Sequence, residues 1–214
     1  MNRSPAVSLA RPARTRAAEV IDLQHHSAWR PALGLGLLSL LLLGLLYALG
    51  TTTLAAQLFP AQAAGSLIER DGQVRGSQLI AQPFTAPGYF VARPSAANYD
   101  PMAAAGSNMA RSNPALQARV AEATAAVAAR EGVAADRVPG DLVTQSGAGM
   151  DPEISPASAQ LQVKRIAHAR GLPVEQVAAV VATHTQGPQW GVFGQPRVNV
   201  LALNLALDAL PAAR

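Results

Sequence analysis

Few of the residue types that carry chemistry stand in a catalytic pattern. The run SGAGM at Ser146–Met150 holds two glycines of a dinucleotide-binding fingerprint, but it lacks the third and leads into Asp151-Pro152-Glu153 instead of straight into a helix. The sequence also contains no Gly-Lys-Ser/Thr phosphate loop. We therefore interpret Ser146–Met150 as a glycine turn and not as a nucleotide site.

The titratable and nucleophilic residues show no site spacing either. His168 and His184 fall on separate predicted helices without a ligand-spaced partner, which favours surface or core histidines over a metal site. Asp151 and Glu153 resemble an acid–base pair, but they directly precede a predicted helix, where negative charge is favoured by the helix dipole. No motif links Ser146 to a histidine base. Cysteine is absent, which excludes disulfides and thiolate ligands. The sequence predicts no catalysis by this chain alone.

Loop segments rich in Gly, Pro, Ser, Asn and Arg are the most unusual feature of the chain. Each of these residue types serves turns through a particular backbone or hydrogen-bonding property, so a loop with many of them has a specified conformation. The needs of the fold explain such loops, and so does a surface that docks onto partners; the sequence leaves both open. The segments are 87–101 (PGYFVARPSAANYDP), 106–108 (GSN), 112–114 (SNP), 141–156 (DLVTQSGAGMDPEISP) and 194–208 (GQPRVNVLALNLALD).

Five residues of these loops are our candidates for a partner interface or for pinning loops together: Arg93, Ser95, Asn108, Gln195 and Arg197. Arg93 and Arg197 are the strongest of them. A planar guanidinium with five donors can fix a loop or meet carbonyls and carboxylates across an interface.

A long apolar run near the N-terminus predicts a membrane span. Pro31–Ile68 contains no charged residue, and its most apolar part, Leu33–Leu49, extends to Leu54. Twenty-two helical residues from Leu33 cover about 33 Å at 1.5 Å per residue, enough for a hydrocarbon core of about 30 Å. A cleaved signal peptide usually has an apolar region of only about 7–15 residues, and the cleavage box at Ala61–Ala63 lies far beyond the run. We expect an uncleaved transmembrane helix over 31–54.

The distribution of arginine sets the expected orientation. Five arginines precede the apolar run and none follows it until Arg70, so the positive-inside rule places the N-terminus in the cytoplasm. Residues 1–30 are polar, without an apolar period, and are expected to form a disordered basic cytoplasmic tail. Residues 55–214 are then expected outside the cytoplasm, on a single-pass membrane protein.

The charge balance argues against nucleic-acid binding, although the sequence pI is 10.3. Residues 1–30 carry five arginines against Glu19 and Asp22, a net charge of +3. Residues 31–214 carry twelve basic and eleven acidic residues, a net charge of +1, with few aromatics and no basic stripe. A surface that follows a phosphate backbone needs clustered Lys and Arg, so we expect no nucleic-acid partner.

Periodicity and capping signals predict an α+β fold, with one N-terminal transmembrane helix followed by a single mixed α/β extracytoplasmic domain over 55–214. Short strands are expected at Ser66–Ile68, Gln78–Ala81, Tyr89–Ala92 and Val138–Thr144. Helices are expected from the Asn113 cap to Gly132, from the Ser155 cap to Gly171, from Pro173 to Gly187 and from the Asn199 cap to Leu210.

At the same loop motifs the chain resembles a known family, the C subunit of the bacterial Kdp potassium-transporting ATPase (KdpC). The resemblance covers about residues 30–210. Three departures are visible: Ala81 and Ala104-Ala105 stand where glycine is usual, and TQGPQWG carries Gln186 and Pro188 where TEGR is common. The matching motifs, in family order and spacing, are GSLI, RGSQLIAQPF, GYFVARPSA, GSN with SNP, VPGDLVTQSGAGMDPEISPASAQ and GQPRVNVLALNLALD.

The resemblance implies a non-catalytic accessory subunit of a high-affinity, ATP-driven potassium import complex in the bacterial inner membrane. Its implied partners are a potassium channel-like subunit, a P-type ATPase subunit and a small single-helix subunit. The complex handles K⁺ and ATP with Mg²⁺, and members of the family have been described as catalytic chaperones that contact ATP and raise the pump's affinity for it. An extracytoplasmic domain makes direct ATP contact awkward, so we expect no cofactor on this chain and a domain that caps the external mouth of the channel-like subunit.

Two other function classes remain as alternatives. A membrane-anchored envelope hydrolase would need a nucleophile–base pair, which the sequence does not show. A membrane-tethered ligand-binding module would bind a small molecule when purified alone, whereas a transporter subunit would not.

Overall fold

The computed structural model describes residues 28–211, which divide into two compact units at Thr53/Leu54. Most of the predicted cytoplasmic tail, residues 1–27, lies outside the described residues. The mixture of helices and strands after one apolar N-terminal helix confirms the predicted α+β class.

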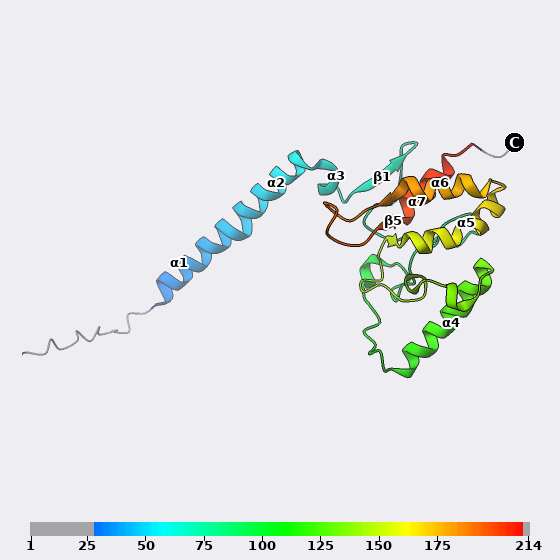
Figure 1. Ribbon diagram of the computed structural model, residues 1–214. Coiled ribbons are helices and arrows are strands. Elements are labelled where there is room, and N and C mark those ends of the chain that lie inside the picture. Colours follow the sequence, from blue (N-terminus) through cyan, green and yellow to red (C-terminus); the bar gives the residue numbers. More distant parts are fainter. Residues whose placement is uncertain (1–27, 212–214) are drawn as a thin grey trace, which may run out of the picture. The chain divides into compact units, whose positions relative to one another are not determined.

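The N-terminal apolar run forms one continuous helix, Trp29–Leu58, that qualifies by length and composition as a membrane span. It consists of α1 (Trp29–Ser39), a π-helical stretch η1 (Leu40–Tyr47) and α2 (Ala48–Leu58). Its 30 residues extend about 45 Å at 1.5 Å per residue, more than a hydrocarbon core requires. Figure 1 shows it as the blue-to-cyan helix. The predicted span 31–54 lies inside it.

The second unit starts with the last turn of α2 and continues with a short helix and a β-hairpin. After α3 (Pro60–Ala63), β1 (Leu67–Arg70) pairs antiparallel with β2 (Gln73–Ser77). The connecting residues Asp71 and Gly72 have φ values of 56° and 70°, as a two-residue Asp-Gly hairpin turn requires. The predicted strand at 66–68 is therefore present, shifted toward Arg70.

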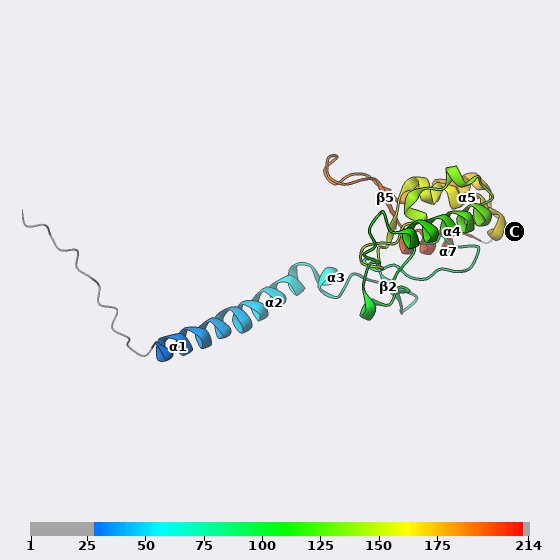
Figure 2. The same cartoon turned by 90° about the horizontal axis from the view of Figure 1, so that it is seen from below.

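Four helices form most of the remaining unit, and the sequence signals locate all of them. The Asn113, Ser155 and Asn199 side chains each accept a backbone N–H of the first helical turn, at 2.9, 3.1 and 3.0 Å. Gly132 and Gly171 end two of the helices in the left-handed conformation. The helices are α4 (Pro114–Glu131), α5 (Pro156–Arg170), α6 (Val174–His184) and α7 (Val200–Asp208), shown from green to red in Figures 1 and 2.

A small antiparallel sheet joins the helices, with strand order β3-β5-β4. Its strands are β3 (Glu153–Ile154), β4 (Thr185–Gln186) and β5 (Arg197–Asn199). The main core packs α5, α6 and α7 around this sheet and around the segment that contains Phe90. A smaller cluster, Val127 with Leu142 and Val143, lies under α4. Residues 28–211 also contain three short 3-10 turns: η2 (Pro101–Ala103), η3 (Ala135–Arg137) and η4 (Gly140–Leu142).

The prediction of a strand at Tyr89–Ala92 is wrong, although the segment is extended and buried. The Asn204 side chain on α7 bonds both the N–H and the C=O of Phe90, at 2.8 and 3.0 Å. Gln162 on α5 does the same for Val91, at 2.8 and 3.2 Å. Side-chain amides thus satisfy the backbone groups that a neighbouring strand would otherwise bond.

The predicted strands at 78–81 and 138–144 are also wrong. Ala81 donates its N–H to the C=O of Met150 at 3.0 Å, a single long-range bond and not a ladder. Val138–Thr144 instead contains the 3-10 turn η4 (Gly140–Leu142), and the N–H groups of Leu142 and Thr144 bond to carbonyls three and four residues back. Gly140 and Asp141 interrupt the apolar run, and such residues favour turns over strands.

Candidate functional site

A cleft of about 610 Å³ brings three of the loop segments together. We refer to it as the arginine cleft, after the arginines that it contains. Arg93 comes from the loop after the Phe90 segment, and Asp141 comes from η4. Asp151 to Ser155 lie on and around β3, and Gln189 to Pro196 belong to the β4–β5 connection, which ends at Arg197 of β5. The residues that line it are Arg93, Asp141, Asp151, Glu153, Ile154, Ser155, Gln189, Phe193, Gly194, Gln195, Pro196 and Arg197.

One ion pair of the arginine cleft follows from the sheet register. β3 and β5 pair Glu153 with Asn199 and Ile154 with Val198. Arg197 lies two residues before Asn199, so it shares a face of the sheet with Glu153 and is its diagonal neighbour. Arg197 Nε donates to Glu153 Oε1 at 2.8 Å, and both side chains remain more than a third exposed. The pair therefore holds the strand ends weakly and leaves guanidinium donors facing solvent.

A second ion pair joins the loop of Arg93 to the turn before β3. Arg93 Nη1 donates to Asp151 Oδ2 at 2.9 Å, with about a quarter and a third of the two side chains exposed. Asp151 Oδ1 accepts the N–H of Glu153 at 3.0 Å, so the carboxylate also fixes its own turn. Arg93 Nη2 approaches Thr144 Oγ1 at 3.4 Å, while Arg93 Nε is buried and bonds to no atom of residues 28–211.

Asp141 is occupied by the start of α5. Its carboxylate accepts the N–H of Ser155 at 2.7 Å, and the hydroxyls of Ser155 and Ser158 also donate to it. A negative charge there complements the N-terminal end of the α5 dipole. With Asp151 and Glu153, the cleft lining carries three carboxylates against two guanidiniums.

Ser95 is not part of the cleft lining, but it joins two of the loops that form the cleft. Its hydroxyl donates to the Gly149 C=O at 2.6 Å and accepts the N–H groups of Ala97 and Tyr99, at 3.0 and 2.9 Å. Gly149 has a φ of 73°, and a Cβ there would come within 2.9 Å of the Ala105 carbonyl oxygen. The two loops can approach this closely because that position is glycine.

The phenol of Tyr99 holds the backbone next to the cleft. Its hydroxyl donates to the C=O of Arg93 at 2.8 Å. Burial raises the pKa of Tyr99 above its usual value of 10.0, and the positive charge of Arg130 acts in the opposite direction. The hydroxyl therefore stays protonated and donating under ordinary conditions.

The structure brings together three of the five predicted candidates. Arg93, Gln195 and Arg197 line the arginine cleft, whereas Ser95 joins two of the loops that form it. Asn108 is exposed, has a φ of 49°, and is not part of the cleft lining. An interface role for any of them stays a prediction.

A buried network around Glu131 was missed from the sequence. The Glu131 side chain is fully buried and accepts Arg165 Nε on both oxygens, at 3.1 and 3.0 Å, and Arg130 Nε at 2.7 Å. Burial lowers the pKa of Arg165, and the charge and hydrogen bond of Glu131 oppose that shift. The one sequence signal was an acid at a helix C-terminus, which the helix dipole disfavours and which therefore suggests a dedicated partner.

Arg165 extends this network to the segment that carries Arg93. Its Nη1 donates to the carbonyls of Pro87 and Tyr89, the latter at 3.1 Å, and its Nη2 donates to Gln162 Oε1 at 2.9 Å. Helix α5 therefore holds the whole segment from Pro87 to Val91, and through it the start of the loop that contributes Arg93.

Comparison with known proteins covers both units of the chain. The family model described as "KdpC: K+-transporting ATPase, c chain" matches residues 29–209. The chain belongs to this family. The KdpC family match includes the apolar helix and every residue that lines the arginine cleft. The resemblance seen in the sequence motifs is confirmed.

Individual relatives carry the KdpC name, and each of them aligns with this chain over most of its own length. "Potassium-transporting ATPase KdpC subunit" of Xanthomonas campestris pv. campestris strain B100 is 56% identical over 188 residues, 88% of this chain and 90% of the relative. The protein of that name from Shewanella putrefaciens is 56% identical over 78% of this chain and 84% of its own. That from Gemmatimonas aurantiaca is 57% identical over 86% of this chain and 93% of its own.

Proposed function

We propose that the chain is an accessory, non-catalytic subunit of an ATP-driven potassium import complex and that it is needed for assembly of the complex. The observation that carries the proposal is the KdpC family match, which spans both the apolar helix and the folded unit. The named relatives are subunits of a potassium-transporting ATPase, so the reaction belongs to the complex. The proposed partners are a potassium channel-like subunit, a P-type ATPase subunit and a small single-helix subunit.

The proposed topology has the helix Trp29–Leu58 crossing the membrane with the N-terminus in the cytoplasm. The five arginines before the helix, with none after it until Arg70, support this orientation. The folded unit then lies outside the cytoplasm, where it can cap the external mouth of the channel-like subunit.

The arginine cleft is the proposed docking surface for a partner subunit. Arg93 and Arg197 each hold one carboxylate through a partly exposed pair, so both can add contacts to a partner without exposing a buried charge. Arginine is enriched in interface hot spots because its fork can bond carbonyls and carboxylates together. Gln195, exposed beside Arg197, adds an amide to the same rim.

An effect of this subunit on ATP affinity is proposed to act through the complex and not through direct contact. A triphosphate needs an excess of positive charge or a set of free backbone N–H groups. The cleft instead has more carboxylates than guanidiniums, and each of its arginines already pairs with an acid. Assembly can change nucleotide affinity elsewhere by linkage.

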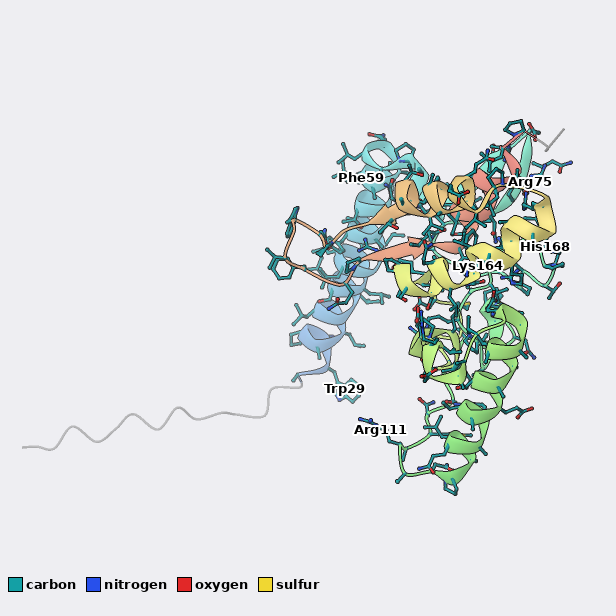
Figure 3. The ribbon with its side chains drawn as sticks, turned by 45° about the vertical axis from the view of Figure 1, so that its right-hand side comes forward. Trp29, Phe59, Arg75, Arg111, Lys164 and His168 are labelled. Atoms are coloured by element: carbon teal, nitrogen blue, oxygen red, sulfur yellow. The ribbon has the colours of Figure 1, made fainter. Side chains whose placement is uncertain are left out.

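The test is a mild-detergent pull-down of the tagged full-length chain, followed by an assay of potassium-stimulated ATPase activity. We expect a channel-like protein and a P-type ATPase to co-purify, and the purified single chain to hydrolyse no ATP. Arg93→Ala and Arg197→Ala should reduce the yield of complex. Arg75→Ala is the matched control, since Arg75 lies on β2, outside the cleft lining, and only approaches Asp71 at 3.8 Å (Figure 3). Purification of the chain without either partner would contradict the proposal.

A further inference from the structure

The connection between β4 and β5 presents an exposed aromatic tip. Trp190, Val192 and Phe193 are 83%, 75% and 60% exposed, and we call residues 190–193 the aromatic tip. The tip has a defined structure: Gln189 and Phe193 exchange backbone hydrogen bonds of 2.7 and 2.9 Å, and the rings of Trp190 and Phe193 meet edge to face at 6.0 Å. Figure 3 shows the side chains of this connection extending away from the rest of the unit.

The stability of the folded unit alone does not account for the exposure of these large apolar side chains. Large apolar side chains gain free energy by leaving water, and a contiguous exposed group of them marks an interaction site. Trp190 also has a φ of 53°, an unfavourable backbone conformation for a bulky residue, of a kind that gathers at functional sites. The main core is complete without the tip, because none of its residues belongs to the buried cluster.

The composition around the tip indicates what it binds. The twelve residues Thr185–Pro196 contain no charged side chain. The segment therefore offers no lysine or arginine that could bind an acidic partner. Tryptophan beside aliphatic and aromatic residues is typical of segments at the membrane–water interface, where the indole keeps its N–H hydrated and buries its ring.

Chain length keeps the second unit close to a bilayer. The candidate span ends at Leu58 and β1 starts at Leu67, a separation of nine residues that reaches about 30 Å at most when fully extended. Within the second unit, the β4–β5 connection lies at the same end as α3, the short helix that follows the end of the apolar helix at Leu58 (Figures 1 and 2).

From these observations we propose that the aromatic tip inserts into the headgroup region of the membrane leaflet next to the Leu58 end of the span. The tip then forms a second, peripheral membrane contact of the folded unit. Phe193 also lines the arginine cleft, so the tip borders the proposed docking surface, but a protein partner fits the projecting part of the tip less well. A standard protein interface buries about 800 Å² per partner and carries about one hydrogen bond per 100–200 Å², whereas the tip is a narrow projection of four residues without charged groups.

The two tryptophans of the chain, Trp29 and Trp190, allow a direct test. The full-length Trp29→Phe variant, reconstituted alone in phosphatidylcholine nanodiscs, has Trp190 as its only tryptophan. We expect its emission to lie at shorter wavelength than that of the denatured chain. We also expect several-fold weaker quenching by aqueous acrylamide, and quenching by lipids that carry a nitroxide near the headgroup.

A matched control moves the reporter to the other end of the unit. The turn between α5 and α6 lies opposite the β4–β5 connection in Figures 1 and 2, and Val174 there is 39% exposed. In the triple variant Trp29→Phe/Trp190→Phe/Val174→Trp, the single tryptophan should be insensitive to the nitroxide lipids. Adding Phe193→Ser and Val192→Ser to Trp29→Phe should return Trp190 to water and restore full acrylamide quenching.

Strong acrylamide quenching of Trp190 in nanodiscs, without quenching by the lipid nitroxides, would overturn the proposal. If Trp190 then became protected from acrylamide on co-reconstitution with the co-purified partner subunits, the tip would be a contact site for a partner subunit. The proposal depends only on the helix crossing the bilayer, so its failure leaves the pull-down of the potassium transport complex as an independent test of the proposed function.

Discussion

Replacing Arg93 with alanine tests whether the arginine cleft binds a partner or only holds its own loops together. The change removes the 2.9 Å pair with Asp151. It leaves Asp151 with its bond from the Glu153 N–H. A partly exposed pair is worth up to about 1 kcal/mol, and loss of a partner from a half-buried carboxylate adds a similar amount. We therefore expect a loss of about 1–2 kcal/mol in the free energy of unfolding.

The assay pairs a melting temperature with a yield of complex, both measured on the full-length chain. For a unit of this size, a loss of about 1–2 kcal/mol corresponds to roughly 2–8 °C in melting temperature. We expect such a chain to remain folded, since whole-domain stabilities are about 5–15 kcal/mol. Loss of an interface arginine should nevertheless weaken assembly about thirtyfold or more, since hot-spot truncations commonly cost about 2 kcal/mol or more.

Two outcomes would refute parts of this reasoning. A much larger drop in melting temperature, with yield of complex falling only in proportion to folded protein, would make Arg93 an internal pin. A normal melting temperature together with a normal yield of complex would show that Arg93 is neither an interface residue nor a loop-holding residue. The double-mutant cycle with Asp151→Ala isolates the pair itself, for which we expect a coupling of about 1 kcal/mol.

Three further predictions follow from orientation, buried amides and ionisation. A reporter enzyme that is active only outside the cytoplasm, fused after Arg214, should be active; an inactive reporter would reverse the proposed topology. Asn204→Leu should lower the free energy of unfolding by about 2–4 kcal/mol in a urea titration, because it leaves the N–H and C=O of Phe90 unpaired in the core. The control Arg75→Ala should change the free energy of unfolding by less than about 0.5 kcal/mol. Burial raises the folded-state pKa of Tyr99, so the unfolded chain releases the phenol proton at lower pH than the folded chain does. The protonated Tyr99 should therefore contribute its full stabilisation below about pH 10, and this stabilisation should be lost as the pH rises through the folded-state pKa. Tyr99→Phe should flatten this alkaline slope in a denaturation series, and an unchanged slope would assign it to another group.

The helices could be predicted from the sequence because their signals are local. A cap and the N–H that it accepts lie within three residues of each other, as at Asn113 and Ser155, and a helix-ending glycine such as Gly132 acts on its own turn. The apolar span is equally local, since length and composition alone define it.

The strands could not be predicted in the same way, because their partners are distant. Whether Phe90 and Val91 meet a strand or a side-chain amide depends on Asn204 and Gln162, which lie 114 and 71 residues further along the chain. Extended, apolar sequence predicts a buried strand equally in both cases.

The cleft shows a similar division. Arg93 and Arg197 could be selected as residues, because arginine in a turn-rich loop suggests a specific contact. Their carboxylate partners could not, since Asp151 and Glu153 also fit the ordinary role of acids before a helix. Asp151 in fact serves its own turn as well as Arg93, so one residue satisfies both interpretations.

The buried amides and the cleft are mechanically connected, which determines how their variants should differ. Gln162 and Arg165 on α5 and Asn204 on α7 fix the backbone from Pro87 to Val91, and Arg93 follows two residues later. Loss of Asn204 should therefore move Arg93 only by destabilising the core. The free energy of unfolding and the yield of complex should then decrease in parallel. Loss of Arg93 removes a rim contact while the core stays intact, so assembly should fall further than stability. The ratio of the two losses, compared between Asn204→Leu and Arg93→Ala, separates a supporting residue from one that meets the partner.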